Sequence, residues 1–274
     1  MIVEFYKPAG LATEAVTSMV YHRGYSPDHE IERFLPDGSV DLIIDLGERP
    51  KFVFDNDSLA IVQTHTRSWV SGIRTRPISI SAGWGEPMLV VGLSPSAARR
   101  ILDLPMYLLA DRVIEAEAVF GPEIYHLRER LTNTPAIADC FRIVDSWITR
   151  RLGNSVEEPA WLRQAAATIA TDPTLRRIDW YARKVGVSGK HLSQTFREHI
   201  GISPKQYQRV HRFQTLVRSV AGNGSPDWVG LAHECGLYDQ SHLISEFRHF
   251  SGFSPVEYLE HRGDILNYVP VSTR

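Results

Sequence analysis

The sequence has little cysteine and no long apolar run, and each shortage excludes a class of protein. Its 274 residues include two cysteines, Cys140 and Cys235, and neither has a cysteine nearby in sequence. A disulfide scaffold and a CxxC metal site are therefore not indicated, and we expect both to be small buried apolar residues. The longest apolar runs, such as Met88 to Leu93, are far too short to span a bilayer, and no signal sequence opens the chain. We expect a cytoplasmic protein with no membrane partner.

The usual catalytic and cofactor-binding motifs are also missing. The sequence has no GxSxG elbow, no cysteine nucleophile with a positioned base and no phosphate-binding loop. The candidate metal ligands His22, His29 and His65 are scattered, with no HxH or HxxxE pairing. Asp41 and Asp45 would share one face of a strand, which a polar edge explains as well as catalysis does. We expect no enzymatic activity, no metal and no cofactor.

What the sequence does contain is an internal repeat, in residues 180–207 and 229–258. Gly186 recurs as Gly236, 50 residues later, whereas Leu192 recurs as Leu243, 51 residues later. The matched positions of the first copy are Ala182, Gly186, Val187, Leu192, Phe196, Arg197, Gly201, Ser203, Pro204 and Tyr207, and those of the second are Ala232, Gly236, Leu237, Leu243, Phe247, Arg248, Gly252, Ser254, Pro255 and Tyr258. A one-residue slip shared by so many positions indicates a duplicated supersecondary unit.

Each copy is predicted to be a helix, a tight turn and a second helix. In the first, Ile178 to Val185 has a helical apolar rhythm, and Gly186 would end that helix in the left-handed region. Ser188 then stands at an N-cap position, ahead of an inward pair formed by Leu192 and Phe196. The second copy repeats these elements at residues 228–235, Gly236 and 239–250. This arrangement is the helix-turn-helix unit, whose second helix enters the DNA major groove.

The duplicated unit resembles a known family of DNA-binding domains. The first copy ends in "GISPKQY" and the second in "GFSPVEY", and a long helix around 208–220 lies between them. These features are similar to the DNA-binding domain of AraC-type transcriptional regulators, over about the last hundred residues. The resemblance implies sequence-specific binding to double-stranded DNA.

The outward side chains of each second helix are the candidate DNA contacts. Lys190 is placed to donate to guanine, Gln194 to engage adenine, and Ser193 to meet either base. The candidate base-reading residues of the second unit are Gln240, Ser241 and Ser245. The candidate phosphate ligands are Ser188, Arg197, Lys205, Arg209, Arg212 and Arg248. One chain would then cover two major-groove segments about 34 Å apart, which predicts an asymmetric half-site.

The formal net charge of -2 averages over two unlike units. From Arg176 to Arg218 ten lysines and arginines face two acids, a local net of +8. From Trp228 to Arg262 two arginines face five acids, a local net of -3. A solvated face would explain an ordinary charge run, but this one-sided excess favours contact with a polyanion. We expect the first unit to contribute more of the affinity for DNA.

The N-terminal half is predicted to be rich in short strands and then helical. The predicted strands are Ile31 to Leu35, Val40 to Leu46, Phe52 to Phe54, Trp69 to Ile73, Ile78 to Ile80 and Met88 to Leu93. The predicted helices are Ala97 to Leu102, Tyr107 to Asp111, Pro122 to Leu131 and Pro135 to Leu152. We therefore expect an α+β multidomain protein, with a small β-barrel and trailing helices ahead of an all-α domain.

The last of these helices has a wide apolar face that needs a partner. Ile137, Phe141, Val144 and Ile148 fall at helical offsets along it. The barrel or a neighbouring helix is the favoured cover, and a second copy of the chain is the alternative. The segment "GNSVEEP", residues 153–159, marks an interdomain boundary. We expect a sensor domain at 1–153 and a DNA-binding domain at 157–264.

Segments of the N-terminal half resemble the sensor domains that precede AraC-type DNA-binding domains. They are "LPDGSVDLIIDLG", "VSGIRTRP" and "VVGLSPSAARRILDLPMYLLADRV" followed by "FG". Such sensors are small cupin-like barrels, so the resemblance implies an unknown small-molecule effector. Trp69, Arg74, Arg76 and Trp84 are the candidate effector-binding residues, because rings and guanidinium groups hold planar or anionic molecules. The alternative is that the tryptophans fill the barrel and the arginines bind loop carbonyls.

The most consistent interpretation is a DNA-binding transcriptional regulator controlled by a small-molecule effector. RNA polymerase and a second copy of the chain are further candidate partners. The alternative is a cupin-like enzyme or small-molecule binder with a vestigial DNA-binding domain, which the acidic second unit favours. Effector, operator, direction of regulation and oligomeric state are not encoded in any pattern of the sequence.

Overall fold

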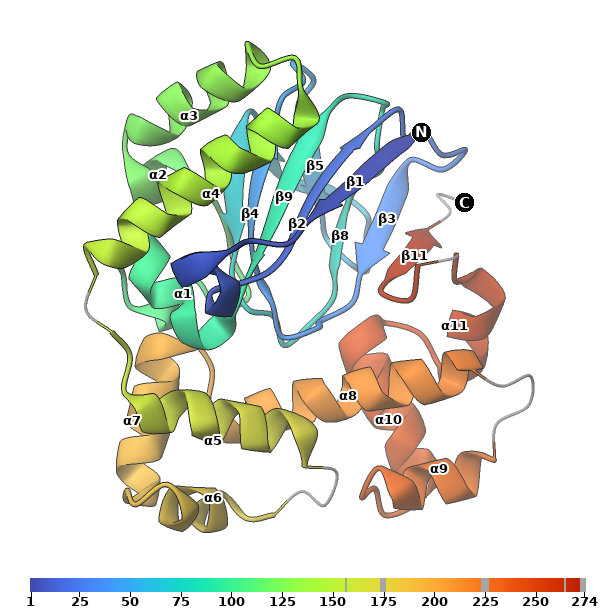
Figure 1. Cartoon of the computed structure of the whole chain (residues 1–274). Helices are drawn as coiled ribbons and strands as arrows, with labels where there is room; N and C mark the ends of the chain where they lie inside the picture. Colours follow the sequence, from blue (N-terminus) through green and yellow to red (C-terminus); the bar gives the residue numbers. More distant parts are fainter. Residues whose placement is uncertain (156, 173–175, 223–226, 264, 272–274) are drawn as a thin grey trace.

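The β-rich part of the chain folds into two antiparallel sheets in the computed structural model, which describes all residues except 156, 173–175, 223–226, 264 and 272–274 (Figure 1). One sheet has six strands in the order β1-β2-β9-β4-β7-β10, and the other has five in the order β11-β3-β8-β5-β6. The strands are β1 (Ile2–Tyr6), β2 (Val16–Arg23), β3 (Ile31–Phe34), β4 (Val40–Asp45), β5 (Lys51–Phe54), β6 (Ile61–His65), β7 (Ser68–Ser71), β8 (Ile78–Ser81), β9 (Met88–Leu93), β10 (Val113–Glu115) and β11 (Tyr268–Val271).

Successive side chains along a strand point to opposite faces of the sheet, and this separates two apolar layers. In β4, Val40, Leu42 and Ile44 are fully buried and belong to the main core, which also contains the helices. Ile43 points the other way and packs with Val53 of the facing sheet and with Trp69, in a smaller cluster. The period of two therefore gives the six-stranded sheet one face for the helices and one face for the second sheet.

The helices of the N-terminal part cover the outer face of the six-stranded sheet (Figure 1). They are η1 (Gly10–Glu14), α1 (Pro95–Leu102), η2 (Met106–Leu108), α2 (Glu117–Phe120), α3 (Glu123–Thr132) and α4 (Ile137–Gly153). The apolar face of α4 is covered within the chain by α1, α3 and η1, and Phe141 stacks on Tyr6. The favoured partner for this face is therefore confirmed.

The C-terminal part is helical and contains both predicted helix-turn-helix units. Its helices are α5 (Ala160–Thr171), α6 (Ile178–Lys184), α7 (Gly189–His199), α8 (Pro204–Gly222), α9 (Trp228–Glu234), α10 (Gln240–Ser251) and α11 (Pro255–His261). After α11 the chain returns to the β-rich part, where β11 pairs with β3 as the edge of the five-stranded sheet. The ring of Tyr268 lies 4.1 Å from that of Phe34, centroid to centroid.

The predicted fold class, a β-rich N-terminal domain ahead of a helical one, is confirmed, but the two sheets do not close into a barrel and particular elements need correction. Each predicted strand is present to within a residue or two, but β1, β2, β6, β10 and β11 were not predicted. The predicted helix from Tyr107 to Asp111 is wrong, because only the short 3-10 turn η2 forms there and Asp111 has a φ of 57°. Both cysteines are buried and free, as expected.

Candidate nucleic-acid interface

The first unit is built from α6, the turn at Gly186 and α7. Gly186 has a φ of +77°, the left-handed conformation that a tight turn needs. The Ser188 side chain caps α7 by accepting a hydrogen bond from the backbone N–H of His191 at 3.1 Å. Leu192 and Phe196 are fully buried against the rest of the domain. The remaining face of α7 is thereby left for solvent or a ligand.

The second unit repeats this construction with α9, the turn at Gly236 and α10. Asp239 caps α10 by accepting from the backbone N–H of His242 at 2.8 Å, and Gly236 has a φ of +64°. Leu243 and Phe247 are fully buried, like their counterparts in the first unit. The duplicated sequence thus gives two second helices of the same construction, α7 and α10.

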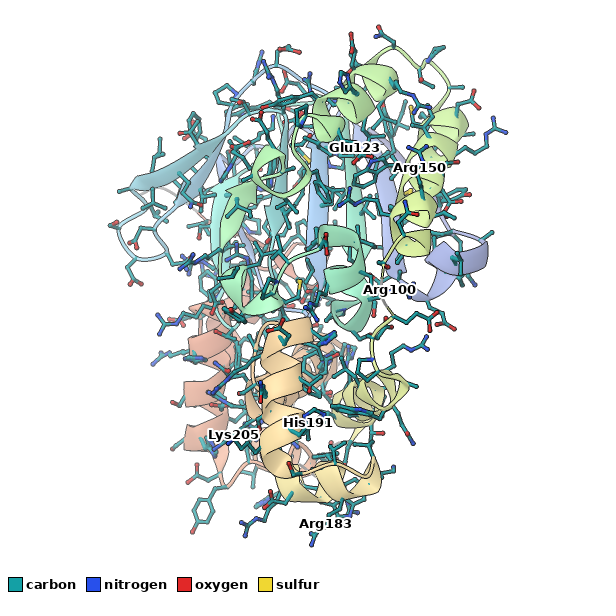
Figure 2. The ribbon with its side chains drawn as sticks, turned by 90° about the vertical axis from the view of Figure 1, so that its left-hand side faces the viewer. Arg100, Glu123, Arg150, Arg183, His191 and Lys205 are labelled. Atoms are coloured by element: carbon teal, nitrogen blue, oxygen red, sulfur yellow. The ribbon has the colours of Figure 1, made fainter. Side chains whose placement is uncertain are left out.

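The predicted DNA contacts lie mainly on the open surface of these helices. In α7, Lys190, Gln194 and Arg197 are exposed and Ser193 is half-buried. In the second unit Gln240, Ser241, Ser245 and Arg248 are exposed, as is Lys205 at the start of α8. Figure 2 shows His191, Lys205 and Arg183 on the helical half of the molecule, far from Glu123 and Arg150.

Both second helices turn their C-terminal ends toward the β-rich part. At the end of α7, Arg99 of α1 forms an ion pair with Glu198 (Nη2 to Oε1, 2.9 Å) and donates to Nε2 of His199 at 3.0 Å. At the end of α10, the guanidinium of Arg33 in β3 lies 5.1 Å from the ring centroid of Phe253. A cation near a helix C-terminus is favourable because carbonyl groups are exposed there. The N-terminal halves of α7 and α10 consequently point away from the sheets. Figure 1 shows α6 and α9 at this same side of the molecule, opposite the sheets.

A buried carboxylate helps to hold the second unit on α8, the helix that connects the two units. Glu246 of α10 accepts from Arg209 (Nη2, 2.6 Å, and Nε, 3.2 Å) and from Arg212 (Nη2, 2.7 Å), both on α8. Burial opposes ionisation of Glu246, but the hydrogen bonds and charges of both arginines outweigh it and lower the pKa of that carboxyl. The expectation of two freely available phosphate ligands at Arg209 and Arg212 therefore needs correction, because both guanidinium groups already serve Glu246.

The residues expected to bind an effector lie at three separate places. Trp69 is 7% exposed and fills the space between the sheets with Val53 and Val113. Trp84 stands at another end, with the Lys51 Nζ 5.0 Å from its ring centroid. Arg74 and Arg76 alone come together, on the wall of a cavity of about 400 Å³.

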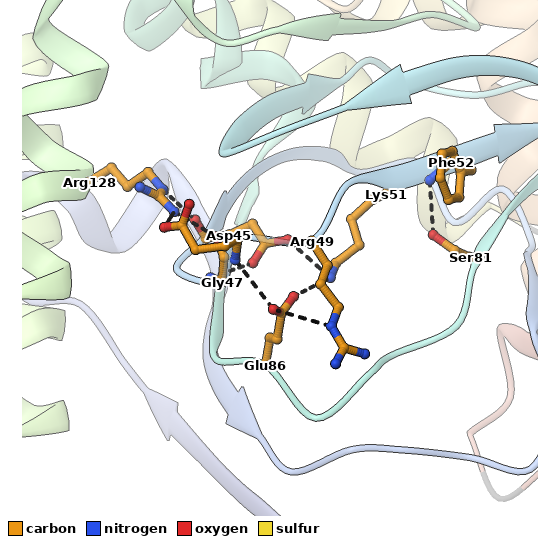
Figure 3. Close-up of polar contacts among 9 residues, drawn as sticks. Asp45, Gly47, Arg49, Lys51, Phe52, Ser81, Glu86 and Arg128 are labelled. Atoms are coloured by element: carbon orange, nitrogen blue, oxygen red, sulfur yellow. Dashed lines mark hydrogen bonds and ion pairs between the residues drawn. The ribbon is translucent and has the colours of Figure 1, made fainter.

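The charged side chains around Trp84 form ion pairs with one another. The ammonium group of Lys51 forms ion pairs with Asp45 at 3.3 Å and with Glu86 at 3.0 Å, as Figure 3 shows. Arg128 closes the same corner by donating to the backbone carbonyls of Asp45 and Gly47. This cluster stabilises the sheet corner and leaves no charge there without a partner of opposite sign.

The three candidate metal histidines remain apart. His29 contacts Glu32 at 2.9 Å and His65 contacts Glu115 at 2.7 Å, whereas burial lowers the pKa of His22. No group of three His, Cys, Asp or Glu side chains that could hold a metal occurs within the described ranges.

Two family models match different parts of the chain. The model described as "Helix-turn-helix domain" matches residues 181–261, from α6 to α11, and so spans both units. Residues 181–261 form an AraC-type helix-turn-helix domain. A second model, described as a domain of unknown function (DUF6597), matches residues 4–115 of the β-rich part. The expectation of an AraC-type helix-turn-helix domain over both units, with a separate β-rich domain ahead of it, is thus confirmed.

Several solved structures are similar to this chain at low identity. ToxT from Vibrio cholerae with a bound unsaturated fatty acid is 14% identical, over 90% of this chain and 96% of that one, with a TM-score of 0.48. The C-terminal domain of AraT, a response regulator from Geobacillus stearothermophilus, is 20% identical, over 37% of this chain and 85% of that one, with a TM-score of 0.35. A DNA-binding transcriptional dual regulator from Escherichia coli is 23% identical, over 38% and 98% respectively, with a TM-score of 0.33. No curated protein sequence matches the chain.

Around the AraC-type domain, the structure adds residues that sequence patterns did not single out. Tyr238, in the turn before α10, is 85% exposed, and Arg183, on α6 of the first unit, is also exposed. Arg33 and Arg99 dock the two units on the β-rich part. A cation in a predicted strand or helix of the β-rich part gives no sign, in the residues around it, that it contacts a distant domain. No helix among the described residues is long and apolar enough to cross a bilayer.

Proposed function

We propose that this chain binds an asymmetric DNA sequence through both units of its AraC-type domain, and that a small molecule held by the β-rich domain changes that binding. The arrangement of α7 and α10 carries the proposal. Their N-terminal halves point away from the sheets, and Glu246 with Arg209 and Arg212 fixes α10 on α8, the helix that connects the two units. A fixed pair of recognition helices suits two successive major-groove segments.

The roles of individual side chains follow from their place on each helix. We assign base reading to Lys190, Ser193 and Gln194 in the first unit. The base-reading residues proposed for the second unit are Gln240, Ser241 and Ser245, and the proposed phosphate ligands are Ser188, Arg197, Lys205 and Arg248. Arg209 and Arg212 act instead as the clamp that sets the spacing.

The alternative of a vestigial DNA-binding domain is weakened by where the acids of the second unit lie. Glu246 is 8% exposed and faces α8, so its charge is neutralised inside the domain. Glu257 accepts from the backbone N–H of Ser254 at 2.6 Å in a capping box. With Asp239, which caps α10, three of the five acids counted in this unit have partners within the fold, and the two arginines on Glu246 reduce the repulsion of DNA.

The proposal extends to the cellular role. The domain boundaries we propose are 1–153 and 157–264, with β11 returning to the first domain. We further propose that the protein acts in the cytoplasm and catalyses no reaction. RNA polymerase and a second copy of the chain are its candidate protein partners.

The test is selection of DNA by the purified chain from a randomised duplex pool at two salt concentrations. We expect enrichment of one asymmetric motif with two separated blocks. The Gln194→Ala variant should lose the preference at one or two positions of one block, while Gln164→Ala, an exposed glutamine on α5, should select the same motif as the wild type. Salt-sensitive retention without enrichment of any motif would refute the proposal.

A further inference from the structure

A cavity of about 400 Å³ lies where the two sheets approach each other without joining. Strand β10 ends one sheet and β6 ends the other, and side chains bridge this seam in place of a backbone ladder. Gln63 donates to the backbone carbonyl of Val113 at 3.5 Å, and His65 contacts Glu115. The cavity is lined by the β5–β6 hairpin on one side and by the segments 74–78 and 111–113 on the other.

Arg74 brings to the cavity wall a guanidinium whose hydrogen-bonding capacity is only partly used. Its Nε donates to the Ser71 hydroxyl at 3.2 Å, but its Nη2 is buried and has no hydrogen-bond partner among the described residues. Burial lowers the pKa of Arg74 to about 10, against the influence of Asp111 and Asp41, so the group stays charged at neutral pH. Asp111 is occupied by the backbone N–H and the hydroxyl of Thr75. A buried cationic donor without a partner is costly, and a bound anion would remove that cost.

The rest of the lining narrows the chemistry of the anion. Val53, Val62, Val113 and Ile78 provide apolar walls, and Arg76 adds a second guanidinium. A guanidinium binds a carboxylate with two parallel hydrogen bonds, and apolar walls favour a hydrocarbon body behind it. A volume of this size suits a small organic ligand.

Residues that adjoin the cavity lining contact both units of the AraC-type domain. Ile73, next to Arg74, packs on Gly201, where an added Cβ would lie 3.0 Å from its Cγ2 and 2.9 Å from the Met106 carbonyl oxygen. On the other side, the carbonyl of Asn56 accepts from Arg33, whose guanidinium abuts Gly252. Gly201 and Gly252 are equivalent positions of the sequence repeat. One cavity is therefore connected to the end of α7 and to the end of α10.

We propose that this cavity binds a small organic carboxylate through Arg74 and Arg76, and that the bound carboxylate changes how both helix-turn-helix units rest on the β-rich domain. That the carboxylate is an effector rests on the proposed regulatory function. That the cavity binds a carboxylate does not depend on that function. A ligand of this kind acts through its different affinity for the two arrangements of the units.

Binding is tested by calorimetry of the full chain with benzoate and hexanoate, against benzamide and hexanamide as neutral counterparts and inorganic phosphate as an anion without an apolar body. We expect at least one carboxylate to bind at least about tenfold more tightly than its amide and than phosphate. The Arg74→Met and Arg76→Ala variants should each weaken that carboxylate by about tenfold or more, and Arg130→Ala, an exposed arginine on α3, should not.

Equal binding of acid and amide, tighter binding of phosphate, or undiminished binding by both variants would overturn the site. Arg76 is exposed, so its variant carries the test if Arg74→Met fails to fold.

Coupling is tested by fluorescence anisotropy on the selected operator with and without the carboxylate that binds. We expect the operator affinity to change about fivefold or more in the wild type. In Arg33→Gln the carboxylate should still bind, but its effect on operator affinity should be lost. An operator that binds equally with and without a calorimetrically bound carboxylate would refute the coupling and leave the DNA-binding function intact. A chain that binds the carboxylate but selects no DNA motif would instead refute the proposed function.

Discussion

The clamp at Glu246 leads to a prediction that separates spacing from phosphate contact. Glu246→Gln keeps the shape of the side chain but removes the charge that holds Arg209 and Arg212. Three hydrogen bonds to the Glu246 side chain, which is 11% exposed, are weakened or lost. Breaking a buried pair from one side costs roughly 3–5 kcal/mol. Because the Arg209 side chain is 32% exposed and keeps some hydration, we expect about 2–4 kcal/mol of lost unfolding free energy.

The functional consequence is measured on DNA. With the clamp loosened, α7 and α10 no longer hold one spacing, so affinity for a two-block operator should fall while affinity for a single block changes little. The salt dependence of binding should stay the same, because no phosphate contact is removed. Denaturant unfolding gives the stability change and anisotropy at several salt concentrations gives the slope. Glu129→Gln, an exposed glutamate on α3, is the matched control and should leave both quantities unchanged.

A contrary result would restore the simpler view of the arginines. If Arg209→Ala lowers the salt slope by about one unit and Glu246→Gln leaves two-block binding intact, Arg209 is a phosphate ligand after all. The contact of Glu246 with the two arginines would then not control the spacing of α7 and α10.

Three further predictions concern other parts of the chain. Gln194→Ala should cost about 1–3 kcal/mol on the preferred sequence and little on random DNA, measured by anisotropy; equal losses on both would make Gln194 a positioning residue. Burial raises the pKa of Asp41 to about 7 in the folded chain, so ionisation of this carboxyl favours the unfolded chain. The wild type should therefore lose stability as the pH rises from about 4 to 7, and Asp41→Asn should not show this loss. Denaturation at pH 5 and pH 8 should show an advantage of Asp41→Asn that grows with pH, to at most about 4 kcal/mol; a constant difference would contradict this. Val269→Asp should place a charge in a fully buried position of β11, and limited proteolysis should then cut the segment after α11 faster; unchanged cleavage would mean that the strand pairing contributes little.

Local signals predicted the helix-turn-helix units well because each part is specified by residues close in sequence. Ser188, Gly186 and the spacing of Leu192 and Phe196 fix a cap, a turn and a buried face with no help from elsewhere. Strand β11 could not be predicted in the same way. It spans four residues and exists because β3, far earlier in the chain, offers a free edge.

The candidate sites show the same limit. Positive charge near a recognition helix predicted phosphate contact at Arg209, and only the folded chain reveals Glu246 opposite it. Likewise, Trp69 and Arg74 are close in sequence but face different surroundings, the space between the sheets and the cavity wall. Side-chain direction depends on which sheet and which edge a residue joins, and spacing along the chain does not encode that choice.

The pairing of β11 with β3 also sets an order in time. The ribosome makes β3 early and β11 only after both helix-turn-helix units, so the edge of the five-stranded sheet stays unpaired throughout their synthesis. An open strand edge invites pairing with other chains. A product that stops short of β11 would therefore carry complete recognition helices beside an exposed sheet edge. The five-stranded sheet is therefore completed last, and premature termination would expose a surface prone to aggregation.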